Sequence, residues 1–272
     1  MPLLLAVGGA VLPLAYLALV IDYGATFFLR TRTRGRTPLL LVMVAVHLGY
    51  LVLWGLEAGH APVTGTPEVL SVLALATAAV YAWVEAVSGD RRTGLFVLLL
   101  AFLFQYAASF LTAGASAGAA GPSAGPHAGG LRAGLHVLPA LVAYTAMAFA
   151  GVYGALYLAA RRALRRHRFG VLFDRLPPLE TLGPMAWHAL LTGFAAMTVA
   201  IAVTPLMFGE GGGEYSAKIV SKIVTGSVAW GVCAAAVLGR WLGRWPLART
   251  SAVAVVGFLL VMALLAVSGA LS

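Results

Sequence analysis

Charged side chains are scarce in this chain: Asp, Glu, Lys and Arg make up only 10% of its 272 residues. A soluble domain carries about 25% charged residues, so this composition excludes an ordinary soluble protein. Acids are the rarer sign, with 9 Asp and Glu against 18 Lys and Arg, while 61% of the residues are hydrophobic. Together these values predict a protein that lies within a lipid bilayer.

Cysteine is also nearly absent, because Cys233 is the only one in the chain. A lone thiol excludes a disulfide framework within the chain and any CxxC redox or zinc motif. The sequence likewise contains no HExxH motif, no P-loop and no Ser/His/Asp order typical of a hydrolase. We therefore expect no catalytic residues, and a chain that acts by binding more readily than as an enzyme.

What the chain has instead is a series of long apolar runs. A membrane-spanning helix needs about 20 predominantly apolar residues. Eight runs are long enough, and they cover residues 3–29, 38–56, 67–88, 95–113, 132–160, 180–207, 215–239 and 250–270. They predict an all-α fold, a polytopic membrane helix bundle in which residues 1–272 form a single integral membrane domain. The Gly/Ala/Ser/Pro stretch at 114–130 has the composition of a flexible linker.

Positive charge is concentrated in alternate connections between these spans. Fifteen of the 18 Lys and Arg residues lie in four connections: Arg30, Arg32, Arg34, Arg36; Arg91, Arg92; Arg161, Arg162, Arg165, Arg166, Arg168, Arg175; and Arg240, Arg244, Arg249. The positive-inside rule predicts that these connections are cytoplasmic and that both termini lie on the exterior side. Because the net charge of +9 is used for topology, we expect no nucleic-acid partner. The predicted location is the cytoplasmic (inner) membrane of a bacterium.

Four of the six histidines lie within these spans or at their ends: His47, His60, His136 and His188. At about 1.5 Å per residue, His47 and His188 lie roughly 12 Å from the cytoplasmic rim. His60 and His136 lie near the exterior rim, which gives an inner pair and an outer pair. An imidazole in the bilayer is costly, and neutral imidazole is a common metal ligand. Two rings at one level on separate helices can hold a haem iron between them.

A plainer interpretation of these histidines stays open at this point. Intramembrane histidines often hydrogen-bond to groups on neighbouring helices, and His60 can be an ordinary solvated residue of an exterior loop. His127, in the flexible stretch, and His167, in an arginine cluster, are expected to have no special role. Lys218 and Lys222 stand four residues apart on one helix face, so they favour an anionic ligand at the exterior surface.

Several short motifs occur in an order that resembles one known family. They are Gly59-His60-Ala61-Pro62, Leu135-His136-Val137 followed by Ala143-Tyr144, Leu179-Glu180-Thr181-Leu182, and Ser221-Lys222 followed by Ala229-Trp230. Their order and spacing resemble the cytochrome c assembly family, which includes CcsA/ResC-type, HemX-type and YpjD-type proteins. In that family the first motif lies in an exterior loop and the second begins a histidine-bearing helix.

Two departures from the family pattern narrow the resemblance. The family's haem-handling proteins carry a tryptophan-rich exterior loop ending in Asp-Pro-Lys, whereas residues 211–222 keep only the lysine, as Lys222. The family's membrane histidine, expected near Leu238, is also missing. The chain is therefore most similar to the short HemX/YpjD-type branch, and full cytochrome c synthase chemistry is not expected from it alone.

The resemblance implies that the chain binds b-type haem and handles it during cytochrome c assembly. His136 and His60 would be axial ligands of an outer haem iron, and Lys222, together with Lys218, would bind the haem propionates. The partners implied are the lipid bilayer, haem, and a periplasmic or membrane component of cytochrome c assembly.

The inner pair has more than one interpretation. In the assembly interpretation, His47 and His188 form an inner ligand pair or serve helix packing. A haem-free permease or accessory membrane subunit would use the histidines for packing or proton relay. A b-haem membrane electron carrier would stack two haems across the bilayer, and the inner haem would need both residues.

Overall fold

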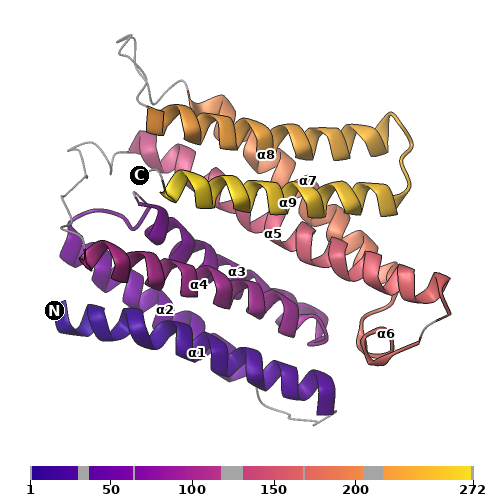
Figure 1. The fold of residues 1–272 in the computed structure, drawn as a ribbon, viewed down its shortest axis with the longest axis horizontal. Coiled ribbons are helices and arrows are strands. Elements are labelled where there is room, and N and C mark those ends of the chain that lie inside the picture. Colours follow the sequence, from indigo (N-terminus) through magenta and orange to yellow (C-terminus); the bar gives the residue numbers. More distant parts are fainter. Residues whose placement is uncertain are drawn as a thin grey trace. The chain divides into compact units, whose positions relative to one another are not determined.

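The part of the chain that the structure describes consists of helices and short connections. The structure is a computed structural model, and it describes residues 2–29, 37–63, 65–117, 131–167, 169–204 and 217–270. No strand occurs in these ranges. Their helices are α1 (Pro2–Leu29), α2 (Thr37–Ala58), α3 (Thr66–Ser88), α4 (Gly94–Ala117), α5 (Leu131–Arg165), α6 (Val171–Arg175), α7 (Leu179–Val203), α8 (Ala217–Trp241) and α9 (Leu247–Ala270). All except α6 are long and apolar enough to cross a membrane, which confirms the predicted helix bundle (Figure 1).

The helix ends agree with the predicted spans to within a few residues at most positions. α5 extends beyond the predicted end at residue 160, and its last turn carries Arg162 and Arg165, where the helix dipole favours cations. Residues 114–117, predicted as part of the linker, continue α4, and residues 118–130 lie outside the described ranges. α6 was not predicted, since five residues are too few to give a periodic pattern. The sidedness of the loops and termini stays a prediction.

Helix α3 illustrates how the local sequence sets the ends of a span. At its start, Pro67 occupies the first turn, where a missing N–H does no harm. The Glu68 carboxylate accepts a hydrogen bond of 3.1 Å from the Gly65 N–H. At its end, Gly89 adopts a left-handed conformation with φ of 64°, and its N–H donates to the Glu85 carbonyl at 2.9 Å. This glycine stop is a common way to end a helix, because glycine has no β-carbon to clash.

The helices form two compact units, residues 1–129 and residues 130–272. In the first unit, α4 packs against α1 and α3, and α2 packs against α3 and α1. In the second unit, α5 runs beside α7 and α9, and α8 packs against α7 and α9 (Figure 1). The single membrane domain expected from the sequence stays a prediction.

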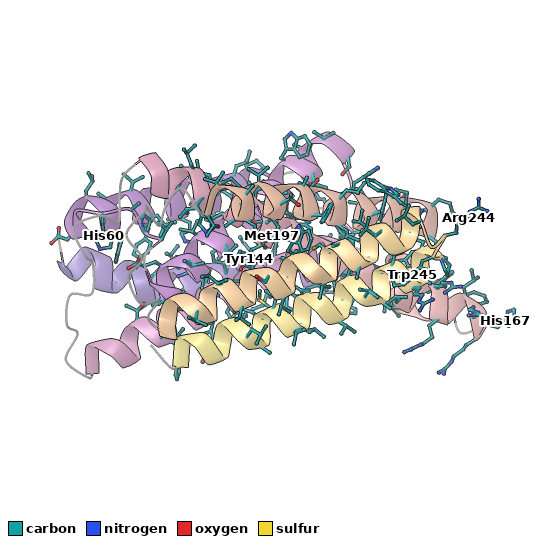
Figure 2. All side chains as sticks on the ribbon, turned by 90° about the horizontal axis from the view of Figure 1, so that it is seen from above. His60, Tyr144, His167, Met197, Arg244 and Trp245 are labelled. Carbon is teal, nitrogen blue, oxygen red and sulfur yellow. The ribbon has the colours of Figure 1, made fainter. Side chains whose placement is uncertain are left out.

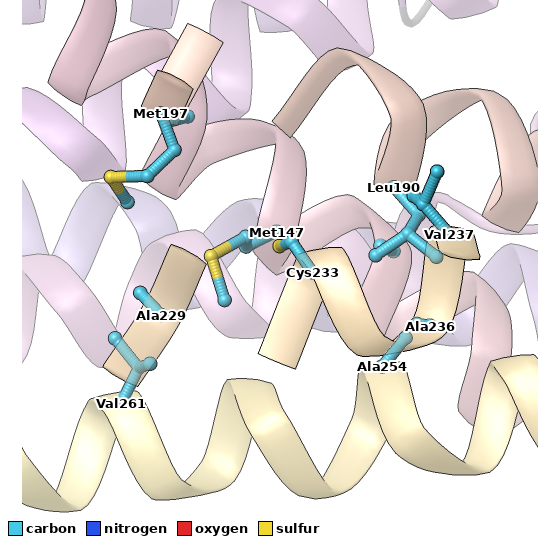
Figure 3. Packing of buried hydrophobic residues seen from close by; sticks show 11 residues of the cluster. Met147, Leu190, Met197, Ala229, Cys233, Ala236, Val237, Ala254 and Val261 are labelled. Carbon is cyan, nitrogen blue, oxygen red and sulfur yellow. The ribbon is translucent and has the colours of Figure 1, made fainter. Parts of the chain in front are cut away.

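The core of the second unit is built from small and sulfur-containing side chains (Figure 3). Met147 of α5, Met197 of α7 and the free Cys233 of α8 are buried there among alanines and valines. Gly151 of α5 lies so close to Phe258 of α9 that a β-carbon on it would come within 2.8 Å of the ring. Such small residues let membrane helices approach closely and gain van der Waals contact.

The interior of the first unit differs because it contains several buried polar side chains. His47, Ser71, Gln105 and Glu85 are all buried, and they come from α2, α3 and α4. A polar group in a membrane interior is costly unless it finds a partner. The partners that these four groups find therefore define the interior of the unit.

Candidate functional site

His136 has a ring held by one nitrogen and open at the other. It lies in the first turns of α5 and is half-buried against the end of α7. Its Nδ1 is 2.9 Å from the Ala200 carbonyl oxygen and 3.2 Å from the Thr204 hydroxyl. A carbonyl oxygen only accepts, so Nδ1 carries the proton and Nε2 keeps its lone pair. Among the described residues, no hydrogen-bond donor reaches this Nε2.

His60 repeats this arrangement in the first unit. Gly59, with φ of 72°, ends α2 and turns the chain so that His60 follows directly. The His60 Nδ1 donates to the carbonyl oxygen of Ala61 at 3.0 Å, which again leaves the Nε2 lone pair available. The ring also meets the edge of Trp54, with 5.3 Å between ring centroids. A histidine whose Nδ1–H is bound to a carbonyl is the form that usually ligates metals.

An apolar groove lies beside His60, between α2 and α3. Its volume is about 620 Å³, and its lining residues are Leu48, Leu51, Val52, Gly55, Leu56, Gly59, His60, Ala61, Pro62, Val72 and Leu75. Small-molecule and cofactor sites usually fall between about 300 and 1,000 Å³ and combine apolar walls with a few polar groups. Among the described lining residues, His60 alone has polar side-chain atoms.

His47 is held in a different way, by both of its ring nitrogens. It is fully buried in the first unit, with an exposed fraction of 0%. The Tyr16 hydroxyl lies 2.8 Å from its Nδ1, and the Ser71 hydroxyl lies 3.0 Å from its Nε2. These three side chains come from α1, α2 and α3, so one imidazole joins three helices.

The series of hydrogen bonds continues from Ser71, and the donor and acceptor of each bond can be assigned. Ser71 donates its only hydroxyl proton to the Gln105 carbonyl oxygen at 2.8 Å, so it must accept from His47 Nε2–H. His47 Nδ1 is then an acceptor, and Tyr16 donates to it. Beyond Ser71, the Gln105 amide donates to Ser109 at 3.2 Å, and Ser109 donates to the Gly9 carbonyl at 2.7 Å. This series of hydrogen bonds, which we call the polar ring, starts and ends on α1 after passing through α2, α3 and α4.

This polar ring leaves no nitrogen of His47 open to a metal. Binding iron would require the loss of one hydrogen bond and would strand a buried hydroxyl, at a cost of about 1–3 kcal/mol. His188, the other residue of the expected inner pair, is exposed on α7, and no hydrogen-bond partner is found for it among the described residues. His47 belongs to the first unit and His188 to the second, as do His60 and His136 respectively. Both pairings therefore stay predictions.

A second polar cluster lies near the other end of the first unit. Glu85 of α3 is only 2% exposed. Its carboxylate accepts a hydrogen bond of 2.6 Å from the Tyr23 hydroxyl and forms an ion pair of 3.0 Å with Arg91. Next to it, Asp90 and Arg92 form a partly exposed ion pair of 2.6 Å. Partial burial raises the pKa of Asp90, but the hydrogen bonds and charge of Arg92 outweigh burial and hold it below its ordinary value.

The two predicted propionate-binding lysines are only partly described. Lys218 and Lys222 fall in the first two turns of α8, and their side chains lie outside the described part of the chain, as does His127. No group of three or more His, Cys, Asp or Glu side chains gathers as a metal site in the residues that the structure describes. Comparisons with protein-family models, with curated proteins and with solved structures find no match.

The polar ring was missed by the sequence analysis, although one signal pointed to it. Gln105 is the only side-chain amide in the chain, and it stands in an otherwise apolar run. A buried amide needs partners for both its oxygen and its nitrogen, so it indicates a polar neighbourhood. The identity of the partners depends on how four helices meet, and no spacing within one helix reveals that.

Proposed function

We propose that this chain is a haem-handling membrane protein of cytochrome c assembly type, with His60 and His136 as the haem-iron ligands. The family resemblance supports the class of function. The histidine geometry supports the choice of ligands, because each residue has its Nδ1 bound to a backbone carbonyl and its Nε2 unengaged. This shared geometry is the observation that carries the proposal.

The surroundings of the two residues suit such a role. The Ala61 and Ala200 carbonyls fix the tautomer and orientation of the rings. His60 lies in the connection between α2 and α3, and His136 lies in the first two turns of α5. Each is at the opposite end of its neighbouring or own helix from an arginine-rich connection. When bound, haem would supply an iron centre for axial ligation, and the groove beside His60 would shield it from water. Lys222 and Lys218 remain the proposed partners of the propionates.

The proposal concerns one haem, at the outer pair. The His47 ring is already satisfied by Tyr16 and Ser71, so we assign it to helix packing. A b-haem electron carrier needs a second haem at the inner level, and this hydrogen bonding does not favour it.

Haem binding is tested by expressing the full chain under haem-replete conditions and recording its reduced-minus-oxidised absorption spectrum. We expect a bis-imidazole b-type spectrum with about one haem per chain, and its loss or conversion in His136→Ala and His60→Ala. His167→Ala and His188→Ala are the matched controls and should keep the wild-type spectrum. A folded wild-type protein without haem would refute the proposal, and so would variants with unchanged spectra.

A second candidate function is a haem-free permease or accessory membrane subunit. The polar ring favours this function, because both ring nitrogens of His47 form their hydrogen bonds with other side chains of the protein and need no cofactor. If the protein expressed under haem-replete conditions is folded but contains no haem, that result would support this alternative.

A further inference from the structure

The connection between α8 and α9 is folded around one tryptophan. The backbone N–H of Trp245 donates to the Gly239 carbonyl at 3.0 Å, which turns the chain back onto the last turn of α8. A β-carbon on Gly239 would come within 2.6 Å of the indole, so only glycine leaves room for it. Arg244 adopts a left-handed conformation with φ of 50°, which costs a non-glycine residue about 1 kcal/mol. The turn therefore holds Arg244 in a defined, strained position.

Two further arginines near this turn are stacked on tryptophan rings. The Arg249 guanidinium lies 4.2 Å from the centroid of Trp245, and the Arg240 guanidinium lies 4.9 Å from the centroid of Trp187 on α7. Stacking positions a guanidinium while leaving N–H groups at its edge to bind an anion. The ion pairs found among the described residues involve neither these two arginines nor Arg244.

Exposed apolar side chains adjoin these cations. Trp241 and Leu242 are 61% and 80% exposed, and they lie between Arg240 and Arg244 in the sequence. In Figure 2, Arg244 and Trp245 lie at the same end of the second unit as His167, which follows the arginine-rich end of α5. The turn thus combines three arginines with an apolar surface at the end of a membrane bundle.

We propose that the α8–α9 turn is a binding site for an anionic phospholipid. Arg240, Arg244 and Arg249 bind the phosphate-bearing headgroup, and Trp241 and Leu242 contact its acyl chains. Juxtamembrane arginines attract anionic lipid, and tryptophan is typical of the membrane interface. A free phosphate ion shares the headgroup chemistry but has no apolar part to contact Trp241 and Leu242. The exposed apolar side chains therefore favour the lipid as the ligand. This inference does not depend on haem binding.

The test measures binding of phosphatidylglycerol and phosphatidylcholine to the purified full chain by native mass spectrometry from detergent. We expect the wild type to prefer phosphatidylglycerol. The triple variant R240Q/R244Q/R249Q should lose about tenfold in phosphatidylglycerol affinity. The matched control R161Q/R162Q/R165Q removes the same charge from the end of α5 and should lose less than about twofold. Added inorganic phosphate should not displace the lipid.

Each other outcome counts against the proposal. Equal losses in the two triple variants would mean that the positive charge acts diffusely. Displacement by inorganic phosphate would mean that the turn binds a free anion, and no preference over phosphatidylcholine would mean no anionic site. If the glutamine triple variant fails to fold, R240K/R244K/R249K keeps the charge but loses the planar guanidinium groups. This variant should lose affinity by several-fold, and wild-type affinity in it would overturn the site.

Discussion

At the scale of single residues, the histidines differ in what their ring nitrogens touch. In His60 and His136, one ring nitrogen donates a hydrogen bond to a backbone carbonyl, whereas both ring nitrogens of His47 form hydrogen bonds with side-chain hydroxyls. The sequence predicts a depth in the bilayer for each of the three, because depth follows from counting residues along a helix. The sequence could not distinguish the histidines with one bonded nitrogen from the histidine with two, because the partners Ala200, Tyr16 and Ser71 are distant along the chain.

The first prediction concerns His47. We expect His47→Ala to lower the free energy of unfolding by about 2–4 kcal/mol, because it leaves a cavity and strands the hydroxyls of Tyr16 and Ser71. Thermal unfolding in detergent measures this effect. His188→Ala, at an exposed position, should change the stability by less than about 0.5 kcal/mol. Haem loss from a folded His47→Ala protein with normal stability would contradict the packing role.

The second prediction concerns Asp90, whose pKa is held below its ordinary value by Arg92. A lowered pKa stabilises the folded state above the ordinary pKa of the carboxyl, and this contribution is lost as the pH falls through the folded-state value. Asp90→Asn should therefore narrow the stability difference between neutral pH and pH values below about 4. Both side chains are partly exposed, so the effect should stay under about 1 kcal/mol and shrink in high salt. An unchanged pH profile of unfolding in Asp90→Asn would show that the pair contributes nothing.

At the scale of the helix, most of the architecture was predictable. Eight spans follow from length and apolarity, since a membrane leaves a helix as the only way for a single segment to satisfy its backbone. Which helices pack together was not predictable, because apolar faces of similar composition do not specify partners. The α8–α9 turn was missed for the same reason: Gly239 and Trp245 acquire meaning only once the chain folds back.

The third prediction tests the end of α3. Gly89→Ala should destabilise the protein by about 1 kcal/mol, because alanine resists the left-handed conformation even though the space around it is open. Gly49→Ala is the matched control, since Gly49 lies within α2 and also has open space around it. The control should show no loss in thermal unfolding. Equal behaviour of the two variants would exclude a conformational role for Gly89.

At the scale of the whole molecule, the chain is a multi-pass bundle of two compact units with different interiors. The second unit packs methionine, alanine and valine, and the first is joined by side-chain hydrogen bonds. Of the two proposed haem ligands, His60 lies in the first unit and His136 in the second.

The fourth prediction concerns the sidedness of the bundle. Cys233 is fully buried, so the wild type should not react with a membrane-impermeant maleimide. We expect Ala61→Cys to be labelled from outside intact cells, and Arg166→Cys to be labelled only after permeabilisation. The reverse pattern would invert the predicted topology and place His60 on the cytoplasmic side.

The one-way order of donors and acceptors through Tyr16, His47, Ser71 and Gln105 has an evolutionary consequence. Each member presents the complement of its neighbour, so a single replacement leaves a mismatch that a second replacement must repair. Related sequences are thus expected to keep the whole set or to exchange it jointly for apolar residues. A lineage that retains His47 while replacing Ser71 with alanine should show a compensating hydroxyl or amide on α3 or α4.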